Sequence, residues 1–212
     1  MENQAMEECR AVYLTAEDLR ITASILYNAY HDDPFFLETL FTGDQIQYEQ
    51  KLRGAIREEL NELWQQEQAL IGMFVGERLV GVACIVTQQV PLGEARYWHW
   101  RLKMLLSAGW QSTQALIHKE NEIIDNLPSN QCGILQFIAI TNNEQGKGYG
   151  SSLVKAVQSW CDEQPHLDGV GIFANTAAHI RLFVEHGFET LEQLEIGKVS
   201  GELLFYRGLK NE

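Results

Sequence analysis

The stretch Thr141-Asn-Asn-Glu-Gln-Gly-Lys-Gly-Tyr-Gly-Ser-Ser152 decides how the rest of the chain is interpreted. It follows the apolar run 134–140 and leads into an apolar, helix-periodic segment, 148–161. This order predicts a strand, a glycine-rich loop and a helix. The first turn of a helix leaves N–H groups without internal partners, and its dipole adds partial positive charge there. Because glycines let a backbone come close to a ligand, the loop predicts an anion site, above all for phosphate, to which Lys147 adds positive charge.

Three phosphate-binding patterns compete for this loop. The P-loop pattern fails because Lys147 precedes Gly148 instead of following it. The dinucleotide fingerprint fails because the glycines alternate, stand five residues beyond the strand, and are followed by a strand that ends at Ala174-Asn175 without an acid. The pattern [R/Q]-x-x-G-x-[G/A] is met by Gln145 to Gly150. A glycine-rich connection without a ligand is the alternative, and the hexapeptide alone does not decide between the two.

The remaining pattern predicts an α+β fold. Hydrophobic periodicity and turn residues predict strands at 10–14, 69–75, 79–89, 134–140, 169–174, about 189–199 and 202–207. They predict helices from Thr15 to before Asp33-Pro34, at 35–41, 44–68, 95–106, 111–127, 148–161 and 177–186. An early hairpin and a late β-loop-α-β-α unit are typical of a mixed sheet with helices on both faces. Without repeats or a Pro/Gly-rich linker, we expect one domain over 1–212, with a helical insertion at about 92–127.

The charge balance limits the classes of partner. Lys+Arg number 16 and Asp+Glu 29, which gives a formal net charge of −13. Nucleic-acid binding rewards clustered basic residues. The nearest approach to a cluster is Arg96, Arg101 and Lys103, so we expect no nucleic-acid partner. A negative field favours a cationic substrate such as an amine.

The cysteines and the N-terminal residues bear on metals and localisation. Cys9, Cys84, Cys132 and Cys161 are widely spaced without a C-x-x-C pair, so we expect neither a metal site nor a disulfide framework. Residues 1–9 carry acids where a signal peptide needs positive charge. No apolar stretch approaches the ~20 residues of a membrane span. We expect a cytoplasmic protein without membrane association.

Two segments of the chain resemble motifs of the GNAT superfamily of N-acetyltransferases. Residues 138–154 are similar to its acyl-CoA-binding core motif, and residues 174–188, which end in Gly-Phe, resemble the next motif in order. Asp32-Asp-Pro-Phe-Phe36 is similar to one bacterial branch, which also tends to carry a helical insertion like 92–127. The resemblance implies the GNAT fold, a mixed and mostly antiparallel twisted sheet. In that fold the fourth strand carries a bulge and splays from the fifth in a V.

The resemblance also implies an acetyl-CoA site. Ile138 and Ile140, with Ala139 between them, are expected to offer backbone groups to the pantetheine arm, as if it were an added strand. The pyrophosphate is expected to bind backbone N–H groups of Gln145, Gly146, Lys147, Gly148, Tyr149, Gly150 and Ser151. Asn175, His179 and Phe183 are expected to face the thioester end. From the residues alone, Asn175 is equally a helix-capping or turn residue, and His179 a partly exposed helix residue.

The implied function is N-acetyl transfer from acetyl-CoA to a primary amine of a small molecule, rather than of a peptide or protein, by direct attack. A backbone N–H stabilises the oxyanion in such a reaction, a base keeps the amine neutral, and an acid can protonate the thiolate. The family often uses a Tyr as this acid, and Phe183 stands at that position. A non-catalytic acyl-CoA-binding protein of the same fold is therefore the alternative. A nucleotide-dependent α/β protein is a second one, which the glycine spacing disfavours.

The catalytic residues stay unassigned at this stage. Asp33, Glu38, Glu94 and His99 are candidate bases, and the sequence does not choose among them. A homodimer is a possible assembly, because dimers are the commonest homo-oligomers.

Overall fold

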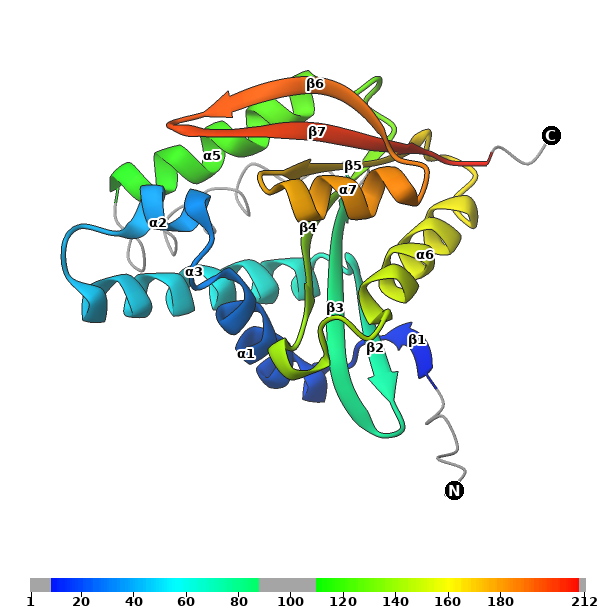
Figure 1. Cartoon of the computed structure of the whole chain (residues 1–212), viewed down its shortest axis with the longest axis horizontal. Helices are drawn as coiled ribbons and strands as arrows, with labels where there is room; N and C mark the ends of the chain where they lie inside the picture. The colour runs from blue at the N-terminus through cyan, green and yellow to red at the C-terminus, as the bar shows by residue number, and fades with distance from the viewer. Residues whose placement is uncertain (1–8, 88–109, 210–212) are drawn as a thin grey trace.

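A computed structural model of the protein describes residues 9–87 and 110–209 (Figure 1). Within these ranges seven strands form one sheet, in the order β1-β2-β3-β4-β5-β7-β6. The strands are β1 Cys9–Tyr13, β2 Ala69–Val75, β3 Arg78–Thr87, β4 Cys132–Ile140, β5 Gly169–Ala174, β6 Glu189–Ile196 and β7 Val199–Arg207. All neighbouring pairs are antiparallel except β4 and β5, which are parallel. The sheet is therefore mixed and mostly antiparallel, as predicted.

Side-chain caps fix where several of the helices begin. The helices are α1 Leu19–Tyr30, α2 Pro34–Leu40, α3 Gln45–Gln65, α5 Trp110–Asp125, α6 Tyr149–Asp162 and α7 Ala177–Glu185. Asp33 accepts hydrogen bonds from the backbone N–H groups of Phe35 and Phe36, and Pro34 occupies the first position of α2, where its missing N–H costs nothing. Asp44 caps α3 in the same way. Asp33 thus fixes the start of α2 and Asp44 the start of α3, with the short connection 41–44 between the two helices.

Helices cover both faces of the sheet (Figure 1). On one face α1, α2, α3 and α5 pack on the strands, with a core that includes Leu26, Phe36, Leu52, Val82 and Phe137. On the other face α6 and α7 pack, with a core that includes Leu153, Val157, Ile172, Phe183 and Leu204. The sheet therefore lies between two helical layers, as the α+β pattern predicted.

A β-bulge in β4 re-aims the strand where the sheet divides. Cys84 of β3 pairs with Phe137 and Ile85 pairs with Leu135, so Gln136 is the extra residue. After the bulge Phe137 packs in the α1–α3 core, and Ile138 packs against the α6–α7 core. The bulge therefore sets which side chains of the strand's second half face each layer.

The strands β4 and β5 separate soon after they meet. They pair only through 132–134 and 169–171, a contact that we call the seam, although both strands continue beyond it. In Figure 1 the strands β5, β7 and β6 cross the direction of β2 and β3. The structure thus has the predicted V-shaped splay.

The seam is built from glycines where the chains come closest. A Cβ on Gly169 would lie 2.1 Å from the Tyr206 carbonyl oxygen. A Cβ on Gly171 would lie 2.6 Å from Leu127 Cδ2. Neither position has room for a side chain, so glycine lets β5 lie close to β7 and to the segment that follows α5.

Several predicted boundaries were wrong by a few residues. The first helix opens with a 3-10 turn, Ala16–Asp18, and its α-helical part starts at Leu19. The last hairpin turns at Gly197, whose φ of +66° breaks the strand earlier than predicted. Of the predicted insertion, 110–125 forms α5, and the helix expected at 95–106 lies outside the described residues. In the part of the chain that the structure describes, no helix is long and apolar enough to cross a membrane.

Candidate functional site

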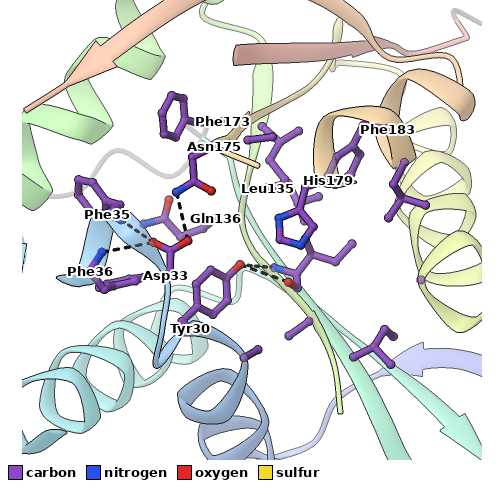
Figure 2. A pocket seen from close by; sticks show the side chains of 18 of the residues that line it. Tyr30, Asp33, Phe35, Phe36, Leu135, Gln136, Phe173, Asn175, His179 and Phe183 are labelled. Carbon is purple, nitrogen blue, oxygen red and sulfur yellow. Dashed lines mark hydrogen bonds between the residues drawn. The ribbon is translucent and has the colours of Figure 1, made fainter. Parts of the chain in front are cut away.

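A cavity of about 270 Å³ opens where β4 and β5 diverge (Figure 2). One wall is β4 beyond its bulge, and the other is the end of β5 with the start of α7. The last residues of α1, the first residues of α2 and part of α5 complete the cavity. Its lining residues are Ala29, Tyr30, Asp33, Phe35, Phe36, Lys119, Ile123, Leu135, Gln136, Ile138, Ala139, Ile140, Gln145, Gly146, Gly150, Ile172, Phe173, Ala174, Asn175, His179, Leu182 and Phe183. The splay thus creates a pocket between the two halves of the sheet.

The structure brings most of the predicted acetyl-CoA residues together in this cavity. Those that line it are Ile138, Ala139, Ile140, Gln145, Gly146, Gly150, Asn175, His179 and Phe183. Those that are near in sequence but outside the lining are Lys147, Gly148, Tyr149 and Ser151. Their roles toward a cofactor stay predictions.

The glycine loop leaves three backbone donors at the start of α6. Gly148, with φ +88°, is the residue before the helix, and the first helical hydrogen bond runs from the Ser152 N–H to the Gly148 carbonyl. The N–H groups of Tyr149, Gly150 and Ser151 consequently have no acceptor within the described residues. Such unsatisfied donors, added to the helix dipole, attract an anion. The loop has the geometry that its sequence predicted.

A buried carboxylate, Glu144, forms ion pairs with two basic side chains at the glycine loop. Its side chain is 8% exposed, with Lys147 Nζ 2.9 Å from Oε2 and Arg78 Nη1 3.1 Å from Oε1. Hydrogen bonds from Lys147 and then Arg78 hold the pKa of Glu144 below its ordinary value. Lys147, predicted as a charge at the pyrophosphate, is therefore engaged by its i−3 neighbour. Glu144 was not among the predicted site residues, although its spacing from Lys147 was a local signal.

Gln145 ties the loop to the end of β4. Its side-chain amide donates to the Ile140 carbonyl oxygen over 3.1 Å. It also lies 3.4 Å from Asn142 Oδ1. The glutamine of the hexapeptide thus orders the loop through its side chain, besides lining the cavity.

Tyr30 is a cavity residue that the sequence analysis missed. It ends α1, and its hydroxyl donates to the Ile138 carbonyl oxygen over 3.2 Å and accepts from the Ile138 N–H over 3.1 Å. Burial raises the pKa of Tyr30 above its ordinary value. The residues lie 108 positions apart, so no local pattern announces the contact.

Charged groups also meet at the cavity's α2 side. Asp33, besides capping α2, accepts a hydrogen bond from Asn175 Nδ2 through its Oδ2 (Figure 2). The Lys119 ammonium lies 4.8 Å from the centre of the Phe35 ring. Burial lowers the pKa of Lys119, against the opposing effect of Asp33 and two glutamates. This corner therefore holds one carboxylate and one amine whose pKa is lowered by burial.

The other candidate bases do not share this position. Glu38 pairs with Lys198 at 3.6 Å and is not a lining residue of the cavity. Glu94 and His99 lie outside the described residues, as does the basic group Arg96, Arg101 and Lys103. Of the four candidates, Asp33 is the one that the described residues bring to the site.

The end of β5 and the start of α7 form the opposite wall. Thr176, not Asn175, caps α7, because its hydroxyl accepts from the His179 N–H. Asn175 is thus free of the capping role and points to Asp33. His179 is exposed at the rim, as the helix-residue alternative expected, and it also lines the cavity. Phe183 is 2% exposed and packs edge-on against Phe188, so no hydroxyl stands at this position.

The arrangement can bind an extended molecule with an anionic end. Its N–H groups at α6 suit phosphate, the open edge of β4 suits an amide-containing arm, and the polar corner at Asp33 suits a cation. The three regions line one continuous cavity between the halves of the sheet.

Comparison with solved structures gives the same fold. An acetyltransferase from Corynebacterium glutamicum related to histone acetyltransferase HPA2 superimposes with a TM-score of 0.67 at 16% identity, covering 94% of this chain and 96% of that one. An N-acetyltransferase from Staphylococcus aureus gives 0.60 at 14% identity, covering 93% and 100%. An aminoglycoside acetyltransferase solved with coenzyme A gives 0.54 at 12% identity, covering 94% and 95%. At these identities the likeness concerns the fold alone.

The sequence comparison reaches further than the fold. No curated protein matches the chain. The model of the Acetyltransferase (GNAT) family matches residues 26–188, well over half of the sequence, and this range includes the glycine loop, Tyr30 and both walls of the cavity. The chain therefore belongs to the acetyltransferase (GNAT) family.

Proposed function

We propose that the protein is an N-acetyltransferase that moves an acetyl group from acetyl-CoA to a primary amine of a small molecule. The observation that carries this proposal is the cavity itself. It joins the anion-attracting start of α6, at Gly146 and Gly150, to the open edge of β4 and to the polar corner at Asp33. A molecule with a pyrophosphate at one end and a thioester at the other matches that sequence of surfaces.

The proposed reaction is direct. The amine nitrogen attacks the thioester carbonyl carbon, the C–N bond forms, the C–S bond breaks, and coenzyme A leaves as a thiolate. Asp33 is the carboxylate among the described lining residues, and its Oδ2 accepts a hydrogen bond from Asn175. We propose that Asp33 attracts and orients the cationic form of the amine before its proton is lost. The formal charge of −13 favours the encounter with such a substrate.

A second candidate is a non-catalytic acyl-CoA-binding protein of the same fold. The observation that favours it is Phe183, which is buried on the cavity wall where the family often has its Tyr acid. Phenylalanine cannot protonate a leaving thiolate. Under this alternative the protein binds acetyl-CoA and does not turn it over.

The first experiment is thermal unfolding with saturating acetyl-CoA, coenzyme A, NAD or ATP. A ligand at ~100 times its Kd stabilises the folded state by about 2.7 kcal/mol. We expect a rise in Tm with acetyl-CoA and coenzyme A alone. A rise with NAD or ATP alone, or with none of the four, would overturn both acyl-CoA candidates.

The second experiment separates catalysis from binding. Release of free coenzyme A thiol is followed with a panel of primary amines and with matched tertiary amines, which lack a proton to lose. Amine-dependent release with primary amines only supports the enzyme. Binding of acetyl-CoA without release across the panel supports the non-catalytic alternative.

A further inference from the structure

The contact between Tyr30 and Ile138 satisfies two backbone groups with one side chain. The phenol oxygen lies 3.1 Å from the Ile138 nitrogen and 3.2 Å from its carbonyl oxygen, and Figure 2 shows both contacts as dashed lines. Ile138 stands opposite Ala83 of β3 and two residues beyond the bulge at Gln136. Since its N–H and C=O both reach Tyr30, they point away from β3 and into the splay.

The position of the hydroxyl is fixed by its neighbours. The Tyr30 ring packs edge-on against Phe36, with ring centres 5.6 Å apart, and against Phe137, at 5.4 Å. Two such contacts from different elements hold the ring in one orientation. Among the described residues that line the cavity, Tyr30 is the one with a hydroxyl. The O–H is thus delivered by a rigid group to one point of the cavity wall.

We propose that the Tyr30 hydroxyl, held in place by the Ile138 N–H, is the oxyanion donor for the thioester carbonyl. This inference rests on the proposed function, because it assigns a catalytic residue to acetyl transfer. The Ile138 N–H donates to the phenol oxygen over 3.1 Å, which leaves the hydroxyl hydrogen as the one that can turn to an oxygen in the cavity. A hydrogen bond accepted by the phenol oxygen also polarises the O–H and strengthens it as a donor.

The electron flow assigns no proton transfer to Tyr30. When the amine nitrogen bonds to the carbonyl carbon, the π pair moves to the oxygen, where the Tyr30 O–H stabilises it. The hydroxyl hydrogen, which points to the Ile138 carbonyl oxygen, needs only to rotate about the C–O bond to reach this oxygen. The pair then returns, the C–S bond breaks, and the sulfur keeps its electrons. The amine proton leaves to solvent or to a base.

The environment of Tyr30 suits a donor rather than an acid. Burial raises the pKa of Tyr30 above its ordinary value, so the phenol keeps its proton at neutral pH. A group that keeps its proton can donate a hydrogen bond to a developing negative charge without reorganisation. This distinguishes Tyr30 from the tyrosine acid that Phe183 replaces.

The experiment measures the carbonyl directly and needs no acceptor amine. Acetyl-CoA labelled with ¹³C at the thioester carbonyl is bound to the protein, and its C=O stretching band is recorded by difference infrared spectroscopy. We expect a shift to lower frequency on binding to the wild-type protein, and a smaller shift in Tyr30→Phe. With any primary amine that is turned over, we expect Tyr30→Phe to lower kcat by about 10²-fold to 10³-fold, the usual effect of deleting one oxyanion donor.

Tyr48→Phe is the matched control. Tyr48 is a buried phenol that also donates to a backbone carbonyl oxygen, that of His31, but it is not a lining residue of the cavity. Its loss should affect stability in a similar way and leave the carbonyl band unchanged. If Tyr30→Phe does not fold, fluorotyrosine at position 30, a stronger O–H donor, should shift the band further than tyrosine does.

The outcomes separate this inference from the proposed function. If acetyl-CoA binds and its band is the same in wild-type and Tyr30→Phe, or insensitive to fluorotyrosine, the oxyanion role is overturned and acyl-CoA binding stands. If acetyl-CoA does not bind to the wild-type protein, both are overturned. A band that responds to position 30 and not to Tyr48→Phe supports Tyr30 as the oxyanion donor.

Discussion

Asn175 Nδ2 donates a hydrogen bond to Asp33 Oδ2 over 3.2 Å, although 142 residues separate them. The bond connects the residue after β5 with the residue that caps α2, and both residues line the cavity. It thus joins the end of β5 to the start of α2 at the site. Asp33 is held by this bond and by two backbone N–H groups, which fix the direction of its carboxylate.

Replacing Asn175 by Ala should release this carboxylate. We expect a loss of about 1 to 3 kcal/mol in the free energy of unfolding, typical of a hydrogen bond to a charged group, and a clear fall in kcat/KM for the amine. Denaturant unfolding and steady-state kinetics measure the two effects. Asn126→Ala is the control, since it removes one side-chain hydrogen bond, donated to the Glu122 carbonyl oxygen, at a residue that does not line the cavity. Equal effects of both variants on kcat/KM would remove Asn175 and Asp33 from the acceptor site.

Gly150→Ala tests the phosphate site without straining the protein. A Cβ there meets only Leu182 Cδ2 at 3.7 Å, an ordinary contact, and Gly150 already lies in α6. Stability should hold or rise by up to ~1 kcal/mol, because Ala favours helix over Gly. The affinity for coenzyme A should nevertheless fall, since the methyl group faces the cavity. Thermal unfolding and calorimetric titration measure both, and unchanged affinity would count against a phosphate at this turn.

Gly148→Ala should differ from Gly150→Ala in its effect on the free energy of unfolding. No atom lies within 4 Å of its Cβ, but its φ of +88° is unfavourable for Ala. We expect a stability loss of about 1 to 2 kcal/mol from the backbone alone. Comparing the two variants in the same titration separates strain in the loop from obstruction of the ligand.

Glu144→Gln should loosen the glycine loop in a pH-dependent way. The lowered pKa of Glu144 means that its stabilising effect is present above its ordinary pKa of 4.5 and is lost as the pH falls through the lower, folded-state pKa. The difference in unfolding free energy between wild-type and Glu144→Gln should therefore be constant above pH 4.5 and shrink below it. Thermal unfolding over a pH series checks this. Glu185→Gln, which removes an exposed carboxylate near Arg181, should show a much smaller difference.

Phe183→Tyr tests whether an acid for the thiolate is what the site lacks. Phe183 lines the cavity and packs on Phe188, so the variant adds one hydroxyl to an existing ring. If proton donation limits turnover, we expect kcat to rise. Rates recorded across pH decide the matter, because an unchanged profile would show that the thiolate leaves without help from this position.

The local features of the fold could be predicted from the sequence. The start of α2 at Pro34, the hairpin at Gly76 and the turn at Gly148 depend on residues within a few positions, and the structure has all three. Among the described residues, periodicity predicted the helices and strands to within a few residues. The splay was expected only through the family resemblance, because strand separation depends on packing between distant segments.

The chemistry of the site was harder to predict because its contacts are long-range. Tyr30 and Ile138 lie 108 residues apart, and Asp33 and Asn175 lie 142 apart, so no spacing in the sequence relates them. Lys147 shows the opposite case. Its positive charge suggested phosphate, yet its i−3 neighbour Glu144 was a nearer partner. The charge of a residue can therefore suggest a ligand although a nearby residue of opposite charge already pairs with it. A hydrogen bond between distant residues leaves no pattern in the sequence.

The glycine seam is the contact through which the two halves of the sheet, β1-β2-β3-β4 and β5-β7-β6, pair with each other, and each half can be described as an arm. The arms are joined over three residue pairs at one end, and their free ends hold the cavity between them. A small rotation at the seam becomes a larger displacement at the far ends of the arms. Gly133 of β4 pairs with Val170 of β5 in the seam, and a Cβ on it would lie 3.3 Å from Val170 Cγ2 and 3.2 Å from Ile85 Cγ2, so a side chain there would press on both arms. The distance between the arms at the cavity therefore depends on residues that do not line it.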